Sequence, residues 1–92
     1  MPQRDKRLER MRNNPRGDWK IEDCESLCRT YDIQVERATG SHVTVSHANQ
    51  REICTIVYGR PIKAVYIKKL VQFVDAVIAR AAELDALTRG KK

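Results

Sequence analysis

The second half of the chain carries the longest regular pattern of hydrophobic and polar positions. From Lys63 to about Thr88, apolar residues recur with the period of a helix that turns one face to a core. These positions are Tyr66, Ile67, Leu70, Val71, Phe73, Val74, Val77, Ile78, Ala81 and Leu84. The pattern predicts one long helix. Its last turns, about residues 79–88, either lengthen the contact with the core or form the surface of a homodimer.

A shorter helical pattern precedes the middle of the chain. Asp18 is a residue type that favours an N-cap, and Glu22 and Asp23 follow where negative charge suits the helix dipole. Apolar positions then recur at helical spacing: Trp19 or Ile21, with Cys24, Leu27, Cys28 and Tyr31. We therefore predict a first helix over about residues 18–31.

Three segments between these helices have the alternation of strands. In residues 32–38, Ile33 and Val35 alternate with Gln34 and Glu36, and residues 42–46 and 53–58 read "HVTVS" and "ICTIVY". The turns between them are short enough for an antiparallel meander. The predicted order is α-β-β-β-α. This is an α+β domain with a three-stranded antiparallel sheet and both helices on one face.

The first 17 residues differ from the rest in composition. Residues 1–13 hold four Arg and one Lys, and Leu8 and Met11 have the spacing of a short helix. Pro15 and Gly17 then interrupt the pattern. We interpret residues 1–17 as a basic extension outside the core and residues 18–92 as the folded domain.

Composition and charge narrow the class of partner. With 92 residues, the chain has room for one domain with a modest core. Lys and Arg number 18 against 12 Asp and Glu, a formal charge of +6 at pH 7. Such an excess favours a polyanion, DNA or RNA, or an acidic protein partner.

The compartment is also suggested by the sequence. No apolar run is long enough to cross a bilayer, and the start, "MPQRDKRLERMR", lacks the apolar stretch of a secretory signal. Three cysteines are an odd number and cannot all pair within the chain. We expect a cytoplasmic protein with reduced thiols and no membrane partner.

Both histidines lie in one stretch, "ATGSHVTVSHANQ", residues 38–50. If Val43 and Val45 face the helices, then His42 faces the open side of the sheet. An imidazole can transfer a proton near neutral pH, so His42 is either a catalytic residue or a polar surface position. His47 has the parity of the valines, which makes it a weaker candidate.

A metal site is a further possibility that the pattern disfavours. Cys24-x3-Cys28 followed by His42-x4-His47 is close to the ligand spacing of a zinc finger. A finger, however, places its cysteines on a hairpin and its histidines on a helix, the reverse of the elements predicted here. The cysteines fit an apolar helix face, and no carboxylate cluster suggests a two-metal site. We predict no metal and no cofactor.

Three stretches of the chain together resemble a known family. They are "RGDWKIEDCESLCRTY", "GSHVTVSH" and "REICTIVYGRPIKAVYIKKLVQFVDAV", within roughly residues 16–78. They are similar to the HicA toxins of bacterial type II toxin–antitoxin systems, and "GSH" is the most specific element. The resemblance implies a fold like that of double-stranded-RNA-binding domains and an mRNA interferase activity with His42 as the functional residue. It also implies a HicB-type antitoxin that covers this histidine.

Metal-independent RNA cleavage needs a base, an acid and positive charge near the phosphate. His42 is then the base or the acid, and its partner is not identifiable from the sequence. Gly40 and Ser41 either orient substrate or serve the turn. The candidate phosphate ligands are Arg51, Arg60, Lys63, Lys68 and Lys69. Arg60 and Lys63 of "GRPIK" are favoured among them, and the alternative for this stretch is a solvated loop with the first residues of the helix. A non-catalytic RNA-binding module and a protein-interaction module remain alternatives.

Overall fold

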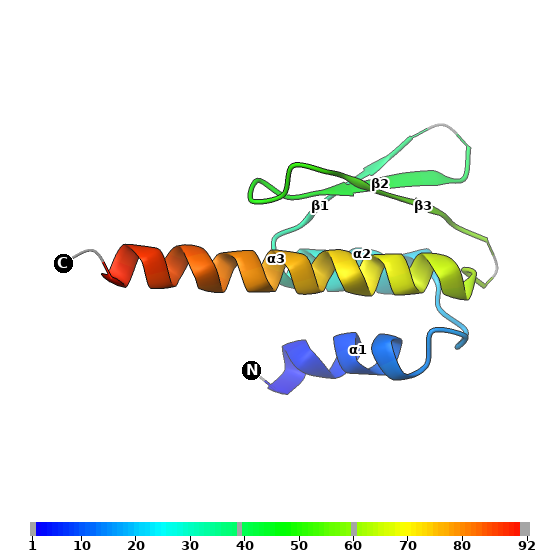
Figure 1. Ribbon diagram of the computed structural model, residues 1–92. Coiled ribbons are helices and arrows are strands. Elements are labelled where there is room, and N and C mark those ends of the chain that lie inside the picture. Colours follow the sequence, from blue (N-terminus) through cyan, green and yellow to red (C-terminus); the bar gives the residue numbers. More distant parts are fainter. Residues whose placement is uncertain (1, 39, 60, 91–92) are drawn as a thin grey trace.

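The computed structural model describes residues 2–38, 40–59 and 61–90, which form three stacked layers (Figure 1). The helices are α1 (Pro2–Asn13), α2 (Ile21–Thr30) and α3 (Ala64–Gly90), and the strands are β1 (Gln34–Arg37), β2 (His42–Ser46) and β3 (Cys54–Val57). The sheet is one outer layer, α2 and α3 are the middle layer, and α1 is the other outer layer. The α+β class and the antiparallel three-stranded sheet are confirmed. The predicted α-β-β-β-α order is present, and α1, in the segment where Leu8 and Met11 have helical spacing, adds a third helix before it.

The sheet is an antiparallel meander in the order β1-β2-β3. Val35 of β1 lies opposite Val45, and Val43 of β2 lies opposite Ile56, so apolar residues share one face. That face packs on α2 and α3 in a single core. β2 has its predicted bounds, whereas β1 and β3 are shorter than predicted at both ends.

The turn between β1 and β2 fixes the start of the second strand. The backbone amide of Ala38 donates to the carbonyl of His42 at 2.9 Å and closes the hairpin. Gly40 has a φ of +65°, in the left-handed region that a residue without a Cβ enters freely. A Cβ built at Gly40 meets no atom within 4 Å, so the conformation, and not the space, favours glycine there.

The start of α2 differs from the prediction. The helix begins at Ile21, and Asp18 is not its cap. The carbonyl of Trp19 accepts the amide of Ile62 at 3.1 Å, and Lys20 is extended, with φ −112° and ψ 163°. A long-range hydrogen bond thus takes the acceptor that a longer helix would use internally.

The end of α2 is a Schellman motif. The amide of Ile33 donates to the carbonyl of Cys28 at 2.8 Å, and that of Asp32 donates to Arg29 at 3.2 Å. Ile33 is buried, which supplies the hydrophobic contact that accompanies this motif. Asp32 has a φ of +58°, where glycine is the usual residue.

We expect Asp32→Gly to raise the free energy of unfolding by about 0.5–1 kcal/mol, because the left-handed strain exceeds the entropy that glycine adds to the unfolded chain. The midpoint of urea unfolding measures the change. Asp32→Ala is the matched control, because it removes the carboxylate and keeps the Cβ, and it should not stabilise. A lower midpoint for the glycine variant would contradict this account of the turn.

The first helix belongs to the core, contrary to the interpretation of residues 1–17 as an extension outside it. Leu8 is 4% exposed and Met11 is 0% exposed, and both join the single core cluster. α1 packs on α3 and α2, on the side away from the sheet (Figure 1). Arg12 forms ion pairs with Glu9 and with Asp75 of α3. Because most residues of this segment are basic or polar, the sequence did not reveal its apolar face, which among the described side chains consists of Leu8 and Met11 alone.

The long helix α3 has a buried part and a projecting part. Its buried residues end at Val77, and they are Ile67, Leu70, Val71, Val74 and Val77. Every described side chain from residue 78 to residue 88 is exposed, with Leu84 at 40% and Leu87 at 61%. The last turns therefore do not lengthen the contact with the core, and a homodimer through them stays a prediction.

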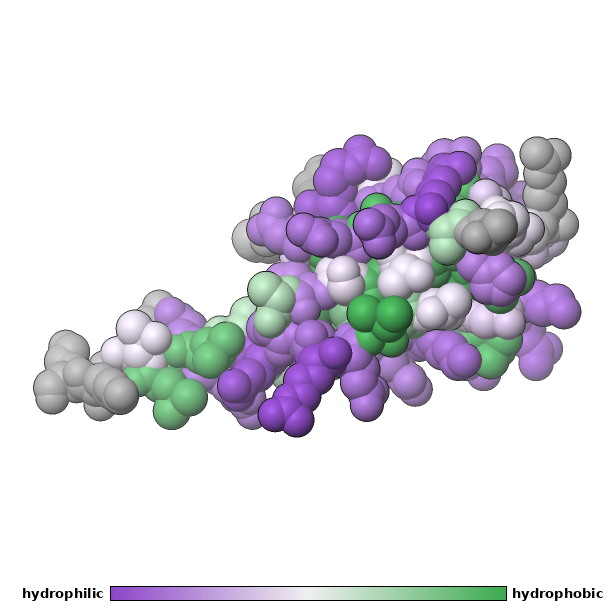
Figure 2. All heavy atoms as spheres, turned by 90° about the horizontal axis from the view of Figure 1, so that it is seen from above, coloured by the Kyte–Doolittle hydropathy of each residue, from purple (hydrophilic) through white to green (hydrophobic). Residues whose placement is uncertain are grey.

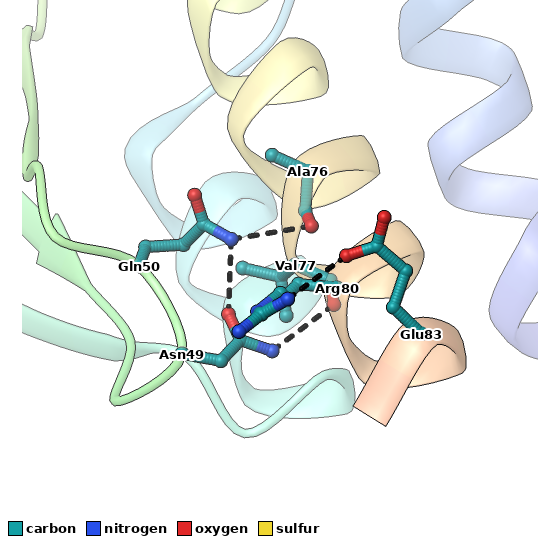
Figure 3. A network of polar contacts seen from close by, with 6 residues as sticks. All are labelled: Asn49, Gln50, Ala76, Val77, Arg80 and Glu83. Atoms are coloured by element: carbon teal, nitrogen blue, oxygen red, sulfur yellow. Dashed lines mark hydrogen bonds and ion pairs between the residues drawn. The ribbon is translucent and has the colours of Figure 1, made fainter. Parts of the chain in front are cut away.

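The β2–β3 loop is attached to α3 where the helix leaves the body (Figure 3). The side-chain amide of Asn49 donates to the carbonyl of Val77 at 3.2 Å, and that of Gln50 donates to Ala76 at 3.2 Å. Gln50 also donates to the side-chain oxygen of Asn49 at 3.0 Å. These bonds hold one end of the sheet in place over the helix.

Candidate functional site

One face of the sheet is left open by the helices (Figure 1). Val43 and Val45 are each 1% exposed on the helix side, so alternate residues and their cross-strand partners point away from the helices. We call this surface the open face. It is carried by Gln34, Glu36, His42, Thr44, Ser46, Thr55 and Val57. Figure 2 looks down on the sheet side and shows mainly hydrophilic residues there.

His42 lies on the open face, as the alternation of β2 predicts. It is the first residue of β2 and is exposed. Val57 of β3 is its cross-strand partner on one side. On the other side, the hydrogen bond from Ala38 places the start of the β1–β2 turn beside it. A large molecule can therefore approach the imidazole from the solvent side.

Ser41 precedes His42 but belongs to a different surface. It lines a cleft of about 720 Å³ between the start of α2 and the β1–β2 turn, together with Lys20, Arg37 and Tyr58. His42 is not among the residues that line this cleft. The carbonyl of Ser41 accepts the amide of Tyr58 at 3.0 Å, which extends the β2–β3 ladder by one pair. Consecutive side chains of the strand point to opposite sides. Ser41 and His42 therefore do not lie on one surface, contrary to the predicted grouping.

Arg37 is held within this cleft. Its guanidinium donates to Glu25 of α2 at 3.0 Å and lies 5.7 Å from the centre of the Tyr58 ring. The hydrogen bond with Glu25 raises the pKa of Arg37 above its ordinary value, so the group stays charged. Since Arg37 shares its face with Val43, this cation is on the helix side and not on the open face.

None of the described candidate phosphate ligands is among the residues that carry the open face. Arg60 lies outside the described residues. Lys63 is exposed just before α3, in the helical layer, and its carbonyl accepts the amides of Tyr66 and Ile67 in the first turn. The residues that carry the open face include no Lys or Arg. Positive charge can reach a phosphate on this face only from its rim.

His47 has a structural environment. It is half-buried after the end of β2, and its Nδ1 accepts the amide of Asn49 at 3.0 Å. Asn49 in turn is bonded to α3. On the basis of this hydrogen bond, we interpret His47 as one of the residues that attach the β2–β3 loop to α3.

The cysteines are core residues. Cys24 and Cys28 are buried on α2, and burial is the main cause that raises the pKa of each thiol to about 12. Cys54 is half-buried, and burial raises its pKa as well. Protonated thiols are weak nucleophiles and poor metal ligands at neutral pH. Within the part of the chain that the structure describes, no three His, Cys, Asp or Glu residues are grouped as metal ligands.

Glu36 is the ionisable residue that sequence reasoning missed on the open face. It is exposed on β1 and pairs with Thr44, two residues along β2 from His42. The alternation of residues 32–38 already placed Glu36 opposite in direction to Ile33 and Val35. The alternation pattern does not contain the pairing register of β1 on β2, and this register places Glu36 diagonally across from His42.

Comparison with known proteins gives no relative for this arrangement: no family model, no curated protein and no solved structure matches the chain. Among the described residues, no helix has the length and apolar character needed to span a membrane.

Proposed function

We propose that the protein is a HicA-like toxin, an endoribonuclease that cleaves mRNA without a metal ion and uses His42 for proton transfer. The observation that carries the proposal is the position of His42. It follows Gly40, whose φ is in the left-handed region, begins β2, and is exposed on a face that none of the described helices covers. Its "GSH" context, the charge of +6 and the resemblance to HicA support the same function.

The reaction fits an exposed imidazole and small neighbours. A 2′-hydroxyl attacks the adjacent phosphorus, the bond to the 5′-oxygen breaks, and one proton leaves the nucleophile while another reaches the leaving group. Thr44 and Thr55, paired across β2 and β3 beside His42, carry hydroxyls that leave room for a sugar–phosphate strand. The observed α+β architecture is compatible with a fold like that of double-stranded-RNA-binding domains, which we include in the proposal.

The proposed regulator is a HicB-type antitoxin that covers the open face. An acidic partner suits a chain with an excess of positive charge, and complementary charge speeds encounter. Such a partner would bury His42 and exclude RNA by occupying the same surface.

The test is incubation of the purified protein with end-labelled RNA in the presence of EDTA, beside a DNA strand of the same sequence. The proposal expects RNA to be cut and DNA to stay intact, because DNA lacks the attacking 2′-hydroxyl. The products should carry 2′,3′-cyclic phosphate and 5′-hydroxyl ends. RNA that is bound but not cut would favour the RNA-binding module, and RNA that is neither bound nor cut would leave the protein-interaction module.

A further inference from the structure

The open face holds two groups able to transfer protons, and they come from neighbouring strands. Ala38 hydrogen bonds to His42 across the first hairpin, and Glu36 lies two residues back along β1. Residues separated by two in this way share a face, and they are diagonal neighbours of the kind that lie about 7–8 Å apart. Both side chains extend over the same surface, within reach of one bound phosphodiester.

Glu36 differs from the other acidic groups near the hairpin. Glu25 belongs to α2, on the helix side of the sheet, and forms an ion pair with Arg37 at 3.0 Å. Glu36 is exposed and takes part in none of the ion pairs that the structure describes. Of the residues that carry the open face, Glu36 is the one carboxylate and His42 the one imidazole.

We propose that Glu36 is the second catalytic residue, acting as the general base for the reaction in which His42 is the general acid. This inference rests on the proposed ribonuclease function. The carboxylate of Glu36 takes the proton of the 2′-hydroxyl as the 2′-oxygen bonds to phosphorus. The imidazolium of His42 gives a proton to the 5′-oxygen as the phosphorus–oxygen bond breaks. Two groups several ångströms apart suit this in-line reaction, because the entering and leaving oxygens lie on opposite sides of the phosphorus.

The products and protons balance. One 2′,3′-cyclic phosphate and one 5′-hydroxyl form, Glu36 ends protonated, and His42 ends neutral. Exchange with water restores both groups. Because the base takes its proton from a 2′-hydroxyl, the reaction requires RNA, and no oxidant, reductant or metal is needed.

A simple structural role for Glu36 predicts the opposite result. β1 is an edge strand, and exposed charges on edge strands discourage pairing with other chains. If that were the function of Glu36, its carboxylate would only repel RNA. Its removal would then raise RNA affinity and leave or increase the cleavage rate.

The deciding experiment compares Glu36→Gln with the wild type in single-turnover cleavage of RNA. We expect the rate at saturating protein to fall by about 10²–10⁴-fold, the usual contribution of a general base, while RNA affinity stays equal or rises. Glu52→Gln in the β2–β3 loop is the matched control, because it removes the same charge from an exposed site outside the open face. It should cleave at the wild-type rate.

Two further readouts separate catalysis from structure. The pH profile of the wild-type rate should contain a limb that Glu36→Gln lacks, because the variant has no group in the role of the base. Added acetate should restore part of the activity of Glu36→Ala, because a small carboxylate can replace the missing base. Circular dichroism of each variant checks that the sheet is retained.

The outcomes distinguish this inference from the function on which it rests. Wild-type cleavage by Glu36→Gln, together with an inactive His42→Ala, overturns the role of Glu36 and leaves the ribonuclease intact. A wild-type protein that binds RNA without cutting it overturns both.

Discussion

His42→Ala is expected to reduce the rate of RNA cleavage by about 10²–10⁴-fold while leaving the fold and RNA affinity nearly unchanged. The loss follows if the imidazole transfers a proton in the transition state. Affinity should persist because we expect most of it to come from contacts of Lys and Arg with phosphate, and the open face itself carries neither residue. Stability should persist because His42 is exposed, so its removal leaves no cavity. Single-turnover cleavage, RNA titration and urea unfolding measure the three quantities.

Two comparisons sharpen this result. Thr44→Ala changes a neighbour on the same face without removing a titratable group, and it should lose far less activity. Lys63→Ala should weaken RNA binding and its salt dependence if that lysine contacts phosphate. If the proposed toxin function holds, the His42 variant should no longer arrest growth in cells yet should still bind the proposed antitoxin. A folded His42→Ala protein that cleaves at the wild-type rate would refute the catalytic assignment.

Met11→Ala is expected to lower the free energy of unfolding by about 2–5 kcal/mol, the usual cost of truncating a buried side chain of this size. Met11 of α1 is fully buried and belongs to the core cluster. The loss combines the transfer of apolar surface and the cavity left behind. Chemical unfolding followed by circular dichroism gives the value.

The controls for this prediction lie on the same helix. Arg10→Ala changes an exposed position of α1 and should alter stability by no more than about 0.5 kcal/mol. Met11→Leu preserves volume and should cost less than about 1.5 kcal/mol. If Met11→Ala were as stable as Arg10→Ala, α1 would be an extension after all, as its composition first indicated.

The interior of the domain shows how far local pattern predicts structure. The period of α3 follows from its sequence, because a helix of that length repeats its apolar face many times. The direction of His42 follows from the two valines beside it. In both cases the signal is a repeat within one segment, and the core bears it out at Val43, Val45 and Leu70.

The errors have a common cause in contacts between distant segments. α2 starts at Ile21 and not at Asp18 because the amide of Ile62 takes the carbonyl of Trp19. Leu8 and Met11 enter the core because α3 offers a second apolar side to α1. The sequence signal of both events is weak. Leu8 and Met11 have helical spacing but are only two apolar residues among arginines, and a single long-range hydrogen bond has no sequence pattern.

The candidate site divides in the same way. By itself, the sequence determined that His42 follows a glycine turn and faces away from the valines, because strand alternation is a local property of the backbone. Only the tertiary structure decided which residues share its surface. The register of β1 on β2 brings Glu36 near the imidazole, whereas Ser41 lines the cleft beside α2 and not the open face. Register depends on pairing between strands, and no single strand contains that information.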